Sequence, residues 1–236
     1  STLNDTVRGL SGVPGVRVID LAAAAESLSP SGVIGDDFLY EHVHLNFQGT
    51  YLMAKELFSC VSDELVKRGK IARAVPPSGL IPISQARQEL GYTTYEQAMI
   101  IKELLDRFSK APFTALSDNA ERRKIYAERD AVADRILSRP ETRDGLVALY
   151  EQALTANPGD WLLMRNVGMA FVALGATERG QVLLERAAKE VGDDADTLFA
   201  LGLAERKLNH MAAAAKCFAR VKALEPKYPG LASVEK

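Results

Sequence analysis

Cysteine, histidine and tryptophan are all scarce in this sequence, and it contains no long hydrophobic run. Its 236 residues include two cysteines, three histidines and one tryptophan. Two cysteines are too few for a disulfide framework or a Cys-rich zinc site. Because no apolar run approaches the roughly 18 residues of a membrane span, we expect no membrane insertion by this chain.

Neither sign of charge is in marked excess. The sequence has 29 Lys and Arg against 31 Asp and Glu, a net charge of −2, and 47% of its residues are hydrophobic. A nearly neutral chain lacks the bulk attraction that draws proteins to nucleic acid or to an acidic membrane surface, so we expect no nucleic-acid partner. The hydrophobic share is sufficient for a buried core, and the length fits one large domain or two small ones.

The C-terminal third of the chain repeats itself. Residues 161–194 align with residues 195–228 at an offset of 34, which pairs Gly168 with Gly202. This period is typical of stacked pairs of antiparallel helices. Two helices cross closely only where a side chain is small, so we expect crossings at Gly168, Gly202 and Ala214.

The two copies resemble the tetratricopeptide repeat. They match most of the family's large, small and proline positions, with departures at Gly180, Gly192 and Glu205. A third, degenerate copy begins at about residue 127 and carries Tyr150 where the family has a large residue. The resemblance implies a short helical solenoid over about residues 127–228, and we therefore expect a mainly α fold.

Helical periodicity continues upstream of the repeats. Residues 93–109 place apolar side chains three and four positions apart, with Thr93 as a suitable N-cap. A highly charged helix over about residues 118–138 is expected to cap the array. The expected divisions of the chain are a partial α/β segment (1–73), a proline-rich linker (74–83), a helical connector (84–141) and the repeat array (142–236).

The first 70 residues show a different pattern. Residues 16–20 alternate and then become apolar after a Pro-Gly pair, which predicts a strand. Residues 2–10 and 21–28 suit helices, and residues 47–68 predict a long amphipathic helix. A strand between helices belongs to a small α/β layer rather than to a solenoid.

Two of the three histidines lie in the loop before that long helix. Glu41 precedes His44 by three residues, and Asn46 and Gly49 follow. This pattern resembles the last block of SGNH (GDSL-type) hydrolases, whose usual acid is Asp. Over about residues 1–70, the resemblance implies that Glu41 orients His44 as the general base of a serine esterase or acyltransferase. The family's Gly-Asp-Ser nucleophile stretch does not occur in the sequence.

Three interpretations of this histidine pair remain open. His42 and His44 are ordinary side chains of a surface loop, or Glu41 and His44 form an acid–base pair, or the histidines bind a metal with Asp36, Asp37 or Glu41. Because no other His or Cys lies nearby in the sequence, we expect no metal, and nothing in the sequence calls for a cofactor.

The resemblance to the repeat family also predicts a binding groove. In that family the first helix of each repeat faces a concave surface, here an apolar strip with basic edges. The residues expected in this groove are Leu162, Arg165, Met169, Val172, Phe199, Leu203, Arg206 and Lys207. An alternative is that the chain's own termini or linker fill the groove.

The sequence therefore predicts an interaction scaffold that binds a protein or peptide through this groove and carries a non-catalytic piece of an SGNH-like domain. The alternative is the C-terminal part of an esterase whose nucleophile lies outside the sequence. The chain begins with Ser1 rather than Met, so we expect it to be processed or cut from a longer protein. An extracytoplasmic parent is consistent with the hydrolase resemblance. An incomplete α/β layer would leave apolar surface open, which favours a homodimer.

Overall fold

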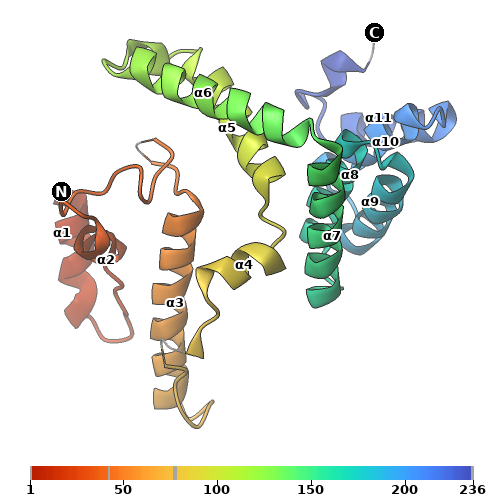
Figure 1. Cartoon of the computed structure of the whole chain (residues 1–236). Coiled ribbons are helices and arrows are strands. Elements are labelled where there is room, and N and C mark those ends of the chain that lie inside the picture. The colour runs from red at the N-terminus through yellow and green to blue at the C-terminus, as the bar shows by residue number, and fades with distance from the viewer. Residues whose placement is uncertain (1, 42, 77–78, 235–236) are drawn as a thin grey trace. The chain divides into compact units, whose positions relative to one another are not determined.

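The fold was analysed in a computed structural model that describes residues 2–41, 43–76 and 79–234. Within these residues the protein is mainly helical, with eleven α-helices (Figure 1). The chain divides into two compact units, residues 1–85 and 86–236. The boundary between them falls within the seven-residue helix α4 (Ile83–Glu89). None of the described helices is both long and apolar enough to cross a bilayer.

The first unit contains three helices, α1 (Thr2–Arg8), α2 (Leu21–Leu28) and α3 (Phe47–Lys67). Helix α2 begins at Asp20, whose carboxylate accepts the backbone N–H of Ala23 at 3.0 Å and pairs with Arg8. A small core of Ala25, Phe38 and Leu52 joins α2 to α3. The helices expected over residues 2–10, 21–28 and 47–68 are thus confirmed to within two residues at each end.

The expected α/β layer is not found. No described residue lies in a β-strand, and residues 16–20 have an irregular backbone. Among the residues that the structure describes, extended backbone pairs at one isolated antiparallel bridge, between Leu39 and Leu45. An alternating apolar segment becomes a strand only beside a neighbour that pairs with its backbone groups. Since the described residues supply no such neighbour, residues 16–20 remain unpaired.

Helix α3 is amphipathic, but its apolar stripe is left exposed. Phe58 and Val61 are 46% and 55% exposed, and Leu57 and Leu65 lie on the same stripe with similar exposure. The opposite side contributes Leu52 to the core and brings Gly49 against the carbonyl of Phe38, where a Cβ atom would lie 2.3 Å from the oxygen. The periodicity therefore predicted the helix correctly, and its apolar stripe is open to solvent.

The second unit is built around two helical hairpins. Helices α8 (Trp161–Leu174) and α9 (Thr177–Val191) form the first, and α10 (Ala195–Lys207) and α11 (Met211–Leu224) form the second. Asp160 and Asp194 cap α8 and α10 by accepting backbone N–H groups three residues on. Helix α7 (Pro140–Ala156) precedes the first hairpin in the chain and packs against α8.

Glycines mark the crossings inside the hairpins, as predicted. A Cβ atom on Gly168 would lie 2.8 Å from Leu184, and one on Gly202 would lie 2.5 Å from the ring of Phe218. At Gly180 the two backbones meet, and a Cβ atom there would lie 2.6 Å from the carbonyl oxygen of Gly168. The helices of each pair can touch at these points because no side chain intervenes.

The connector folds differently from the expected cap. The charged helix α6 (Asn119–Leu137) lies along α5 (Thr94–Phe108), and the rings of Phe108 and Tyr126 stack 5.6 Å apart. Only Leu137, at the end of α6, reaches the core of the hairpins. The small apolar side of α6 thus packs against α5, so α6 does not cap the array.

The array is instead covered by the turn before α5. Gly91 lies against Leu163, and the side-chain amide of Asn157 donates to the carbonyl of Glu89 at 2.8 Å. The buried hydroxyl of Tyr150 donates to Glu96 at 2.5 Å and lies 3.0 Å from the hydroxyl of Thr93. Thr93 and Glu96 also form a capping box at the start of α5. This polar cluster fixes the start of α5 on α7.

Candidate functional site

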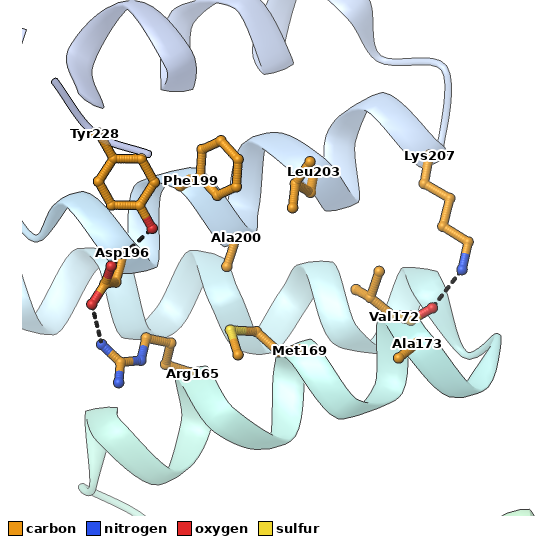
Figure 2. A pocket seen from close by; sticks show the side chains of 10 residues that line it. All are labelled: Arg165, Met169, Val172, Ala173, Asp196, Phe199, Ala200, Leu203, Lys207 and Tyr228. Atoms are coloured by element: carbon orange, nitrogen blue, oxygen red, sulfur yellow. Dashed lines mark hydrogen bonds and ion pairs between the residues drawn. The ribbon is translucent and has the colours of Figure 1, made fainter. Parts of the chain in front are cut away.

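A groove runs along the first helices of the two hairpins. Helices α8 and α10 lie side by side, and their facing side chains enclose a volume of about 500 Å³ (Figure 2). The floor is apolar because Met169 and Val172 from α8 and Phe199 and Leu203 from α10 line it. The 34-residue offset explains this alignment, since equivalent positions of successive repeats point to the same side.

The structure brings together most of the residues that the sequence predicted for this groove. Arg165, Met169, Val172, Phe199, Leu203 and Lys207 line it, with Ala173, Asp196, Ala200 and Tyr228. Leu162 and Arg206 lie outside the lining. Leu162 is exposed, and the guanidinium of Arg206 lies over the ring of Phe218, 5.9 Å from its centroid.

One end of the groove is closed by a cluster in which two carboxylates pair with one cation. Arg165 lies 3.5 Å from the carboxylate of Asp194 and 3.7 Å from that of Asp196. Its guanidinium also lies over the ring of Trp161, 5.8 Å from the centroid. Burial opposes ionisation of Asp194, but hydrogen bonds from Thr197 and the charge of Arg165 outweigh it and lower the pKa of Asp194. The cation at this end is therefore already matched by two carboxylates.

Tyr228 completes that end, and the sequence analysis missed it. Its hydroxyl donates to Asp196 at 2.8 Å, and its ring lies 5.0 Å from that of Phe199. Burial and the Asp196 hydrogen bond raise the pKa of Tyr228 to about 12. Leu231, in the following 3₁₀ turn Leu231–Ser233, is buried in the same cluster as Val221. The signal available in the sequence was an aromatic residue at the last position of the second repeat copy, shortly after the last helix of the array.

The other end of the groove carries an exposed cation. The ammonium of Lys207 donates a hydrogen bond to the backbone carbonyl of Val172 across the groove (Figure 2). Among the described residues no carboxylate pairs with Lys207. The two ends therefore differ, with a compensated cluster at Arg165 and an uncompensated positive charge at Lys207.

The second predicted site is the loop that holds Glu41 and His44. The side chain of Glu41 is 1% exposed, and one of its oxygens contacts Nδ1 of His44, whose side chain is 54% exposed. The Glu41 carboxylate also accepts the backbone N–H groups of Val43 at 2.8 Å and of His44 at 3.2 Å. The carboxylate thus both shapes the loop and holds the ring. In the neutral tautomer that donates from Nδ1 to Glu41, Nε2 carries the lone pair of the imidazole.

The remaining acids of this loop have structural partners. Asp37 accepts the Ser29 hydroxyl at 2.8 Å and the Gly35 N–H at 2.9 Å, and the Ser29 hydrogen bond is the main cause of a lowered pKa at Asp37. Within the part of the chain that the structure describes, no three His, Cys, Asp or Glu side chains form a group that would hold a metal ion. His42, the other histidine considered as a ligand, lies outside the described residues.

Comparison with known proteins identifies no family for this chain. No protein-family model matches it, and a search of curated proteins finds no significant relative.

Proposed function

We propose that the protein is an interaction scaffold whose second unit is a tetratricopeptide-like array, and that the groove between α8 and α10 binds an extended peptide segment of a partner. The single observation that carries this proposal is the continuous apolar floor of the groove. Met169 is 44% exposed there, and Phe199 and Leu203 are only partly buried. Apolar side chains that water reaches inside a concave surface are typical of peptide-binding sites.

The repeated geometry supports the same proposal. Two hairpins spaced by 34 residues, each with a glycine at its crossing, place equivalent positions on one concave side. Three features of that side serve binding rather than folding. It is lined from two repeats, it is open to solvent, and it carries polar groups at its two ends. In this proposal residues 1–70 are a non-catalytic piece similar to the end of an SGNH-type domain.

A displayed library of random peptides, selected on the full chain, tests the scaffold proposal. We expect enriched peptides that lose at least tenfold in affinity for Met169→Glu, because a carboxylate on the apolar floor would have to be desolvated when the peptide binds. Val182→Glu is the matched control, since Val182 is 52% exposed on α9 and does not line the groove. Enriched peptides that bind both variants equally would show that the groove is not the binding site.

A second candidate function is favoured by the contact between Glu41 and His44. A buried carboxylate on Nδ1 of a half-exposed imidazole is the acid–base arrangement that activates a hydroxyl nucleophile in serine esterases. The proposal makes the chain the C-terminal part of an SGNH-type esterase or acyltransferase. Its serine nucleophile and oxyanion donors are then left to a segment outside this sequence.

Hydrolysis of p-nitrophenyl acetate by the full chain, beside His44→Ala, tests this second candidate. Hydrolysis above background that His44→Ala abolishes would support an active acid–base centre within the chain. Equal rates for the two proteins would mean that these residues assemble no esterase centre here. His210→Ala is the matched control, because His210 also holds a Glu carboxylate through Nδ1, that of Glu205, but lies in the helical array.

A further inference from the structure

We infer that the groove selects peptides that present an acidic side chain at the Lys207 end, after one or more apolar side chains seated on the floor. This inference rests on the proposed function, because it names the chemistry of the partner for the same groove. It adds a charge requirement at one end of the groove.

The charges along the groove carry the inference. Arg165 is shared by Asp194 and Asp196, and Asp196 also accepts the Tyr228 hydroxyl, so this end offers no unmatched positive charge. A carboxylate placed there would lie beside Asp196 and be repelled. Lys207 contributes a full positive charge whose described partner is a neutral carbonyl. The positive charge is therefore compensated by carboxylates at the Arg165 end but not at the Lys207 end, so the electrostatic potential becomes more positive toward Lys207.

The hydrogen bond of Lys207 does not prevent this role. An ammonium group has three donors, and the bond to Val172 uses one of them. The bond also holds Nζ over the rim of the groove rather than away in solvent (Figure 2). A carboxylate from a peptide can therefore join Lys207 without breaking the existing contact, and the charged hydrogen bond it gains is stronger than one to a neutral amide.

The closed end fixes the other boundary of the peptide. Tyr228 lies across the groove with its ring on Phe199, and Gly230 follows so closely that a Cβ atom there would lie 2.4 Å from the Phe199 ring. Apolar side chains of the peptide are thus confined to the floor between Tyr228 and Lys207. A free fatty acid would also place an apolar chain on the floor and an anionic group at Lys207. The groove, however, is open along its length and lined from two repeats. This openness suits a chain with side chains at intervals.

Charge reversal at Lys207 tests the inference. The peptide-library selection is repeated on the full chain and on Lys207→Glu, with Lys216→Glu as the control at an exposed lysine of α11 outside the groove. We expect Asp or Glu at one fixed position of the peptides enriched on the native chain and on Lys216→Glu. On Lys207→Glu we expect Lys or Arg at that position. For an enriched peptide, exchanging the acid for its amide should weaken binding by about fivefold to tenfold.

Different failures have different meanings. Peptides that need Met169 but show no acidic preference would overturn the inference and leave the scaffold proposal standing. No peptide that depends on Met169 would contradict both. Tighter binding of laurate than of any enriched peptide, abolished by Lys207→Glu, would replace the peptide with a fatty acid and overturn the inference. Thermal melts of each variant identify any loss of binding that follows from unfolding.

Discussion

At the scale of single residues, the polar cluster around Tyr150 contributes to the stability of the start of the array. Its hydroxyl is buried and bonded to Glu96, with Thr93 at 3.0 Å. We expect Tyr150→Phe to lower the free energy of unfolding by about 1–2 kcal/mol, because Glu96 and Thr93 lose a buried partner. Chemical denaturation measures this loss. Tyr95→Phe is the control, since Tyr95 packs on the same core and its hydroxyl has no hydrogen bond among the described residues.

The same residues predict a loss of stability in alkali. Burial, and then the charge of Glu96, raise the pKa of Tyr150 well above its ordinary value of 10.0, and Tyr228 is raised to about 12. The folded state therefore keeps these protons where the unfolded chain releases them, so their contribution is complete below pH 10 and falls as the pH rises above it. Melting temperatures at pH 8, 10 and 11 should decline, and less steeply for Tyr150→Phe. A decline equal to that of the native chain would contradict the assignment.

Some residues of the groove could be predicted from the sequence and others could not. Arg165, Met169 and Phe199 could be placed because a repeat of fixed length carries each position onto an equivalent one. Tyr228 could not be placed this way, since it is the last position of the second copy and aligns with Asp194 of the first copy, which is not aromatic. Arg206 was expected in the groove, but its guanidinium lies over the ring of Phe218 on α11 instead.

At the scale of helices, the backbone-to-backbone crossing at Gly180 gives a test whose control should change stability in the opposite direction. Gly180→Ala would place a methyl group 2.6 Å from the carbonyl oxygen of Gly168, a backbone atom that cannot rotate away. We expect α8 and α9 to separate and the free energy of unfolding to fall by about 1–3 kcal/mol. Gly145→Ala in α7 meets no atom within 4 Å and should raise stability by up to about 1 kcal/mol through helix propensity. Equal effects of the two changes would contradict this explanation.

Helices were predictable from the sequence where the single strand was not. A helix satisfies its own backbone hydrogen bonds, so apolar spacing and a capping residue such as Thr93 or Asp160 are enough to locate it. A strand depends on a neighbour that the local sequence does not contain. Residues 16–20 have the composition of a strand, but the described residues offer them no partner. The contact between Glu41 and His44 was predictable because both lie in one short loop.

At the scale of the whole molecule, the apolar stripe of α3 predicts self-association. Leu57, Phe58 and Val61 lie on one side of a helix and are each more than 40% exposed. Contiguous apolar surface of this kind favours association with another copy. Sedimentation velocity should show an average mass that rises with concentration, and Phe58→Glu should reduce the rise. Val132→Glu, at an exposed apolar position of α6, should leave it unchanged. A constant monomer mass would contradict the prediction.

The stacking of Arg165 on Trp161 gives the protein an optical reporter of its own. The indole is the only one in the sequence, and the guanidinium that touches it also lines the groove. Any occupant that draws Arg165 from its place must change the surroundings of that one fluorophore. Emission of the unlabelled protein therefore reads out events at the Tyr228 end of the groove, while an occupant held at the Lys207 end alone leaves the spectrum unchanged.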